Sequence, residues 1–207
     1  VPHAGKTDLD DALASSLEGF NKWRAETPLN RQVIFEKAAR ILEKDFDEIS
    51  ANLTREMGKP LAEANVEMQV AIDLLRWYGE EGKRVYGRII PSRLPGSQQG
   101  AAEVPLVPSW AFVAWNFPAT KVVRKVAGAL AAGCSITIKP SEETPATAIA
   151  IGKAFTEAGL PAGVLNIVFG VPAEVSEHLL ASPIPRKLSF TGSVPVGVHL
   201  QQLAAKN

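Results

Sequence analysis

The first 84 residues of the chain carry apolar side chains at helical spacing. Residues 8 to 84 are therefore predicted to form helices. The first of these helices has one apolar face, made by Leu9, Leu13, Leu17 and Phe20. Thr27 and Pro28 then have the residue types of an N-cap and of the first helical position, so a second helix is expected to begin there.

Two further apolar stripes predict helices that pack into a core. One ends at the helix-breaking residues Gly58 and Pro60 and comprises Val33, Ile34, Ile41, Leu42, Phe46, Ile49 and Leu53. The next spans roughly residues 61 to 83 and comprises Val66, Val70, Leu74, Leu75 and Trp77. Residues 85 to 109 are richer in Gly, Pro, Ser and Gln, with β-like pieces at 88–90 and 101–106, and are expected to be a connector or a small edge sheet.

From residue 110 onward, short apolar runs alternate with helical segments. Strands are predicted at 110–115, 134–139, 164–169 and 187–191, and helices at 119–132, 145–158, 173–181 and from 193. Such alternation is typical of a parallel sheet covered on both faces. The chain is therefore predicted to be an α/β protein, with a helical segment and connector over residues 1–109 packing on a Rossmann-like portion over residues 110–207.

Composition and charge narrow the function classes. The 207 residues carry 22 basic and 22 acidic side chains, so no net charge favours nucleic acid or an anionic membrane surface as a partner. No apolar run reaches the ~18 residues that a membrane span requires. The single cysteine, Cys134, cannot form an internal disulfide, which favours the cytoplasm. The three histidines show no metal-ligand spacing.

Polar residues and glycines follow the predicted strands. Asn116 comes after the first, Lys139 and Glu142 after the second, and Gly192 and Ser193 after the fourth. A carboxylate and an ammonium suit ribose hydroxyls, and the start of a helix suits a phosphate. The usual G-x-G-x-x-G fingerprint is missing, so these residues alone leave two interpretations open. They form a dinucleotide site, or they are ordinary helix caps and solvated turn residues.

Four ordered segments resemble the aldehyde dehydrogenase superfamily: FVAWNFP, RKVAGALAAGCSITIKPSEETPATA, EAGLPAGVLNIVFG and KLSFTGSVPVG. The segment EMGKP at residues 56–60 is similar to the same family. The resemblance runs over essentially the whole chain, and the arginine at position 124 is similar to that of succinate-semialdehyde dehydrogenases. It implies NAD(P)-dependent oxidation of an aldehyde to a carboxylic acid through a thioester.

The resemblance also implies roles for particular residues. Asn116 would donate a hydrogen bond to the substrate oxyanion, with helix capping as the alternative. Lys125 would lie near the active site as a proton relay, or be a solvated lysine. Arg124 would bind a carboxylate of the substrate, for example succinic semialdehyde, or be an ordinary surface arginine.

The implied cofactor site comprises Trp115, Lys139, Glu142, Gly170, Gly192 and Ser193. Lys139 and Glu142 would hold the adenosine ribose, Ser193 would contact the pyrophosphate, and Trp115 would flank the phosphate. A glutamate at position 142 would repel a 2′-phosphate, so NAD is favoured over NADP.

The family mechanism also needs a cysteine nucleophile and a glutamate base, whose motifs lie beyond the residues matched here. Cys134 is expected to be a structural thiol, because it opens an apolar strand. The chain is therefore interpreted as an amino-terminal part that is inactive alone, and a homo-oligomer is implied by the resemblance. A non-catalytic NAD-binding or interaction module and a purely structural assembly protein are the competing interpretations.

Overall fold

A parallel sheet of four strands lies at the centre of the computed structural model, which describes residues 1–206. Its strands are β3 (Ser109–Phe112), β4 (Ile136–Lys139), β5 (Leu165–Ile167) and β6 (Lys187–Phe190), in the order β5-β4-β3-β6. In register, Phe112 lies between Lys139 of β4 and Phe190 of β6. The predicted α/β fold with alternating strands and helices is confirmed.

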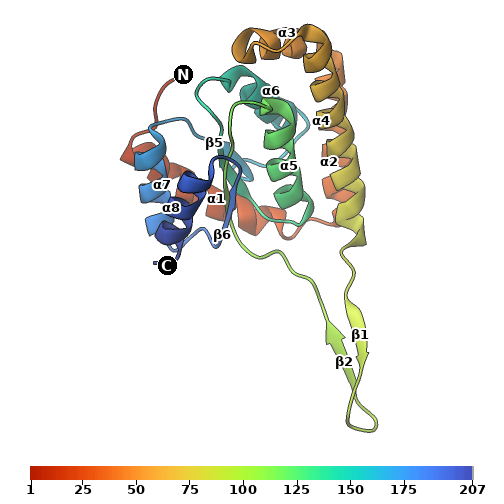
Figure 1. Cartoon of the computed structure of the whole chain (residues 1–207). Helices are drawn as coiled ribbons and strands as arrows, with labels where there is room; N and C mark the ends of the chain where they lie inside the picture. The colour runs from red at the N-terminus through yellow and green to blue at the C-terminus, as the bar shows by residue number, and fades with distance from the viewer. Residues whose placement is uncertain (207) are drawn as a thin grey trace.

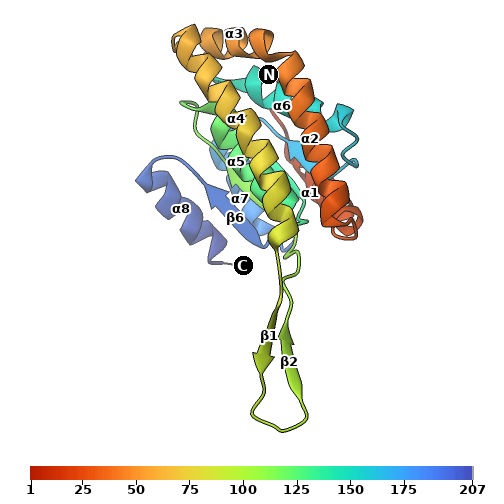
Figure 2. The same cartoon turned by 90° about the vertical axis from the view of Figure 1, so that its right-hand side faces the viewer.

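Alternation along β3 divides the apolar side chains between the two faces of the sheet. Ala111 belongs to a core with α2 (Pro28–Lys44), α3 (Phe46–Met57), α4 (Leu61–Glu81), α5 (Pro118–Ala131) and α6 (Pro145–Glu157). Trp110 and Phe112 belong to a second core with α1 (Lys6–Trp23), α7 (Pro172–Ala181) and α8 (Val194–Ala204). Figures 1 and 2 show these two helical layers on opposite sides of the strands. The sheet is therefore doubly wound.

Local capping explains where several helices begin and end. The Thr27 hydroxyl accepts a hydrogen bond from the Asn30 N–H at 3.2 Å, with Pro28 in the first turn, so the predicted start of α2 is confirmed. Gly58 ends α3 with a φ of 83°, which favours glycine. The apolar stripe of residues 33–53 is divided between two helices, because the backbone breaks at Asp45.

Part of the predicted core is wrong for α4. Val66 and Trp77 are 64% and 54% exposed, and Val70 is also exposed. Two predicted core residues of other helices, Leu17 of α1 and Val33 of α2, are exposed as well. The buried face of α4 consists instead of Ala64, Glu67, Met68, Ala71, Ile72, Leu75 and Gly79. This face combines the small residues Ala64, Ala71 and Gly79 with larger apolar ones, and it is rotated away from Val66, Val70 and Trp77.

An exposed β-hairpin follows α4 and the short 3-10 helix Gly82–Arg84. Strands β1 (Arg88–Pro91) and β2 (Gln98–Ala101) pair antiparallel, and Figure 1 shows them projecting away from the rest of the molecule. The predicted strand at 101–106 is wrong, since β2 ends at Ala101. The pairing confirms a small sheet in this connector, separate from the central one.

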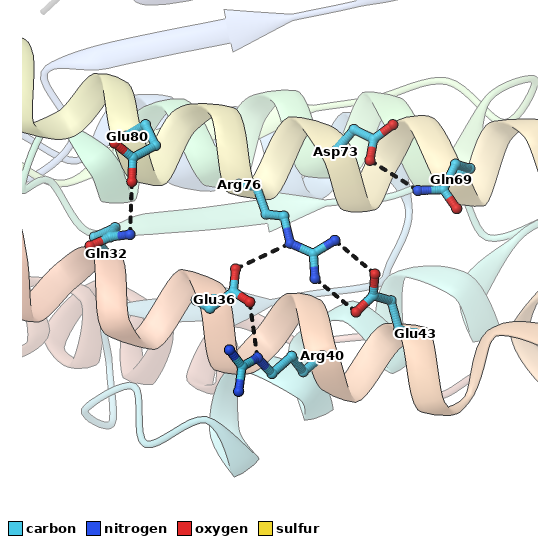
Figure 3. Close-up of polar contacts among 8 residues, drawn as sticks. All are labelled: Gln32, Glu36, Arg40, Glu43, Gln69, Asp73, Arg76 and Glu80. Carbon is cyan, nitrogen blue, oxygen red and sulfur yellow. Dashed lines mark hydrogen bonds and ion pairs between the residues drawn. The ribbon is translucent and has the colours of Figure 1, made fainter.

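A network of charged side chains joins α2 to α4 (Figure 3). The Arg76 guanidinium of α4 donates to both carboxylate oxygens of Glu43 at 2.7 Å and to Glu36 at 3.1 Å. Glu36 also accepts from Arg40 at 2.9 Å. Hydrogen bonds from Arg40 lower the pKa of Glu36 and those from Arg76 lower the pKa of Glu43.

Over residues 1–206, no helix combines the length and the apolar character that crossing a bilayer requires.

Candidate functional site

A cleft lies where the strand order reverses. Successive strands β3, β4 and β5 extend the sheet in one direction, and β6 then pairs on the opposite side of β3. In doubly wound sheets the crevice beyond the carboxyl ends of such strands is the usual ligand position. Here it has a volume of about 410 Å³ and is lined by residues 112–114, 139, 141–143 and 190–193, with residues of α7 and α8 closing its side.

A buried cation and a carboxylate meet on one wall of this cleft. Lys139 is only 5% exposed, and its Nζ donates to Oε1 of Glu142 at 2.5 Å. The Gly170 N–H donates to the same oxygen at 3.1 Å. Burial raises the pKa of Glu142, but the hydrogen bonds from Lys139 and Gly170 outweigh it and lower that pKa overall. The alternative of a solvated turn is wrong for Lys139, because its ammonium is enclosed.

The start of α8 forms the opposite wall. Ser193 holds the N-cap position with extended backbone, yet its side chain makes no capping hydrogen bond. The hydroxyl and the first N–H groups of α8 are therefore available to an anion, which the helix dipole also favours. A Cβ on Gly192 would lie 2.5 Å from the Phe190 ring, so a glycine is required where the backbone passes this ring before α8.

The loop after β3 carries Trp115 and Asn116. Trp115 is half exposed, and the buried strand predicted over 110–115 ends at Phe112. The alternative that Asn116 caps α5 is wrong, because Phe117 holds the N-cap position and the helix has no side-chain hydrogen bond from its N-cap. The Oδ1 atom of Asn116 accepts a hydrogen bond from Nζ of Lys121 instead.

Glu67 of α4 satisfies the N-terminus of α5. Its Oε1 accepts from the N–H groups of Ala119 at 2.9 Å and Thr120 at 3.2 Å, and its Oε2 pairs with Lys59. Sequence reasoning missed Lys59, Glu67 and Lys121. A signal for Glu67 did exist: it lies among Ala64, Met68 and Ala71, where a carboxylate needs partners to be buried.

A second cleft, of about 630 Å³, contains Arg124 and Lys125, with Lys121, Lys187 and Ser189 around them. The Lys125 Nζ donates to the Ser189 hydroxyl at 2.8 Å. Burial, and then the charges of Lys121 and Lys187, lower the pKa of Lys125. Lys125 is therefore not simply a solvated lysine. The Arg124 side chain is exposed and makes no hydrogen bond or ion pair with any of residues 1–206.

The predicted site residues thus fall into three places. Lys139, Glu142, Gly192 and Ser193 line the first cleft, with Gly170 bonded to its carboxylate. Arg124 and Lys125 line the second cleft. Trp115 and Asn116 lie on the loop that follows β3. Cys134 is buried and lines the second cleft beside β4.

The strand order, together with the cleft at its reversal, defines a Rossmann-type doubly wound α/β protein. The model of the Aldehyde dehydrogenase family matches residues 1–207, and the chain belongs to that family. Membership of this family accounts for both the doubly wound fold and the order of the sequence motifs along the chain.

Individual relatives agree with this assignment. The chain is 46% identical over 204 residues to 4-(hydroxymethyl)benzenesulfonate dehydrogenase TsaD1 of Comamonas testosteroni, covering 99% of this chain and 43% of that protein. It is 37% identical over 207 residues to the NADP(+) succinate-semialdehyde dehydrogenase GabD of Escherichia coli. That match covers 100% of this chain and 43% of GabD.

A solved structure agrees as well. The crystal structure of succinate-semialdehyde dehydrogenase from Burkholderia pseudomallei superposes with a TM-score of 0.97 at 38% identity, covering 100% of this chain and 43% of that one. The chain thus spans less than half the length of these relatives. It corresponds to their amino-terminal region.

Proposed function

We propose that the cleft between β3 and β6 binds NAD(P), and that the chain is the cofactor-binding part of an aldehyde dehydrogenase. The observation that carries this proposal is the enclosed Lys139–Glu142 pair facing a helix N-terminus whose Ser193 hydroxyl is not used for capping. A ribose and a pyrophosphate require these two kinds of partner. The residues present therefore fit the cofactor.

Different residues of the cleft bind different parts of the cofactor. Glu142 accepts from the adenosine ribose hydroxyls while Lys139 donates to them. Ser193 and the N-terminus of α8 bind the pyrophosphate, and Gly192 lets it approach because no side chain intervenes. Trp115, exposed on the loop after β3, flanks the phosphate. When bound, the dinucleotide supplies the hydride acceptor for aldehyde oxidation.

Asn116 and Lys125 are proposed to act on the substrate side. The Nδ2 group of Asn116 donates a hydrogen bond to the aldehyde oxygen as negative charge develops on it. Lys125, whose pKa is lowered by burial and by Lys121 and Lys187, releases a proton more readily than an ordinary lysine. In this proposal Asn116 stabilises negative charge and Lys125 transfers a proton, and neither residue forms a covalent bond with the substrate.

The thioester step requires a cysteine nucleophile and a glutamate base. We do not assign the nucleophile to Cys134, because its side chain is only 8% exposed and packs at the start of β4. The 207-residue chain by itself is therefore expected to bind the dinucleotide without oxidising an aldehyde. The complete enzyme activity is a proposal for a polypeptide that also contains those two groups.

The proposed substrate is an aldehyde with a remote anionic group. Arg124 is exposed on the second cleft and on a neighbouring cleft between α4 and the start of α5. It has no acidic partner among residues 1–206, so its guanidinium is available to a carboxylate or sulfonate. The names of the relatives, which refer to a benzenesulfonate and to succinate semialdehyde, support this class. NAD is proposed as the preferred cofactor because of the Glu142 carboxylate. A cytoplasmic location and a homo-oligomer complete the proposal.

Calorimetric titration of the chain with NADH tests the cofactor site. Replacing Lys139 by Met removes a charge-assisted hydrogen bond of ~1.5–3 kcal/mol, so binding is expected to weaken about tenfold or more. Lys153→Met, at an exposed position on α6, is the matched control and should leave the affinity unchanged. Thermal unfolding of each variant separates lost binding from lost structure. Failure of the wild-type chain to bind NADH, or equal binding by Lys139→Met, would refute the cofactor site.

A further inference from the structure

Lys121 contacts the proposed oxyanion donor directly. It lies in the first turn of α5, and its Nζ donates to the Oδ1 atom of Asn116, five residues earlier. The contact is partly buried, and Lys121 lies beside Arg124 on the second cleft and on the neighbouring cleft between α4 and the start of α5. The two residues therefore form one unit at the beginning of α5.

The chemistry of the two groups fixes the direction of this contact. An ammonium has donors and no acceptor, whereas a carboxamide has an oxygen at one end and an NH₂ at the other. Lys121 can therefore bond only the oxygen of Asn116. The Nδ2 group makes no hydrogen bond with any of residues 1–206, so its two N–H donors remain available.

We propose that Lys121 is a positioning residue, which fixes the orientation of the Asn116 carboxamide so that its NH₂ group is presented to the substrate oxygen. The inference rests on the proposed function of Asn116 and adds a residue that orients it. Without Lys121, the carboxamide could rotate and present its oxygen, which would repel a developing oxyanion. A preorganised donor avoids that cost.

The loop on which this contact acts is itself held in place. Glu67 binds the N–H groups of Ala119 and Thr120, and its charge is balanced by Lys59, with both side chains buried. The Lys59 Nζ also lies 4.3 Å from the centre of the Phe117 ring. The backbone that follows Asn116 is thus held by the capped start of α5, and the Lys121 contact acts on the side chain of Asn116 itself.

Several charged groups face Lys121 and determine its titration. Glu63 and Glu67 are the acidic groups around it, and Lys59, Arg124, Lys125 and Lys187 are the basic ones. Burial lowers the pKa of Lys121, and the charge of Glu67 opposes that effect only in part. The charged form, which binds Asn116 most strongly, is therefore lost at a lower pH than for an ordinary lysine.

Carbon-detected NMR on the 207-residue chain tests the proposal without any enzyme assay. The side-chain carbonyl carbon of Asn116, identified by its loss in Asn116→Ser, reports the hydrogen bond that Oδ1 accepts. Its resonance is expected to shift with pH at the same midpoint as the Cε resonance of Lys121. Lys121→Met should shift the Asn116 signal at neutral pH and remove its pH inflection. Lys121→Arg, which also offers only donors, should keep the Asn116 signal near its original position.

Lys153→Met is the matched control and should leave the Asn116 signal unmoved. The proposal is overturned if Lys121→Met does not shift that signal, or if the Asn116 inflection and the Lys121 titration have different midpoints. The wild-type titration alone compares the Asn116 and Lys121 midpoints, even if a variant fails to fold. Lys121 lies outside the cofactor cleft, so NADH binding is a separate outcome. A chain that fails to bind NADH but passes the NMR test would retain the orienting contact and lose the proposed function.

Discussion

At the scale of single residues, the Glu142 carboxylate has two tasks in the proposed cofactor site. It pairs with Lys139, and it accepts the Gly170 N–H, so its position is determined from two sides. The same negative charge would lie near the 2′-position of the adenosine ribose. Since like charges repel, we expect this one side chain to discriminate against a 2′-phosphate.

Glu142→Gln is therefore expected to change the cofactor preference. Glutamine keeps the length of the side chain and an oxygen for the Gly170 N–H, but it removes the charge. The ratio of the dissociation constants for NADPH and NADH should fall about tenfold, which corresponds to ~1.4 kcal/mol. Titrations with both nucleotides measure this ratio, and Glu157→Gln at an exposed end of α6 serves as the control. An unchanged ratio would show that Glu142 does not discriminate between the cofactors.

At the scale of elements, the α2–α4 contact depends on both packing and charge. Apolar side chains from both helices belong to one core, and the Arg76 network in Figure 3 lies at the edge of that contact. Arg76 bonds Glu43 with two parallel hydrogen bonds, a geometry that makes an ion pair more effective than a single contact. Partial exposure of all three side chains limits its contribution through solvent screening.

Arg76→Met should lower the free energy of unfolding by about 1 kcal/mol at pH 7, because exposed ion pairs contribute up to that amount. The pKa values of Glu36 and Glu43 lie below the ordinary 4.5 in the folded chain. Their contribution is therefore complete above that value and is lost as the pH falls through the lowered pKa values. Urea unfolding at pH 7 and at pH 3 measures the difference between variant and wild type, which should shrink at the lower pH.

The control for this prediction is Lys37→Met, which removes an exposed charge from α2 that has no ion-pair partner among residues 1–206. It should change the stability little at either pH. A difference for Arg76→Met that stays constant between the two pH values would indicate lost packing of the arginine stem instead of a lost ion pair.

At the scale of the whole molecule, the regular part of the chain could be predicted and the contacts between distant segments could not. Alternating runs after residue 110 predicted the four strands and their helices, because the spacing of apolar residues and the position of glycines and prolines are local properties of the sequence. The outward position of Val66 and Trp77 depends on which face of α4 meets its neighbours, which no local pattern contains. Likewise, Gly19 meets the backbone of Gly163 across a long stretch of sequence.

The candidate site divides in the same way. Residues at the ends of strands or just after them, such as Lys139 and Ser193, could be predicted because parallel strands bring their carboxyl ends to one edge. The sequence signals that Glu67 is buried, but it does not identify the partners of Glu67 or of Lys121, since these depend on the contact of α4 with α5 and on the bend before α5. Motif resemblance located the residues proposed for chemistry, and the packing of helices determined which side chains orient them.

The hairpin is the part of the molecule with the least contact to the rest. All residues of β1 and β2 are exposed, including Ile89 at 81%, and each strand has a free edge. Exposed apolar edge strands favour pairing with another chain. If the proposed homo-oligomer forms through this hairpin, association and the stability of the two cores should be separable.

Replacing residues 88–101 by a short Gly-Ser linker tests that separation, because Arg88 and Ala101 already lie opposite each other. The variant is expected to sediment as a monomer, with its unfolding midpoint shifted by about 2 °C or less, since the cores lose no contact. Ile89→Lys should also weaken association, because a charge on an edge strand opposes pairing. Val66→Lys, at an exposed position on α4, should not. Association that survives both hairpin variants, or that Val66→Lys abolishes, would place the contact between copies elsewhere on the molecule.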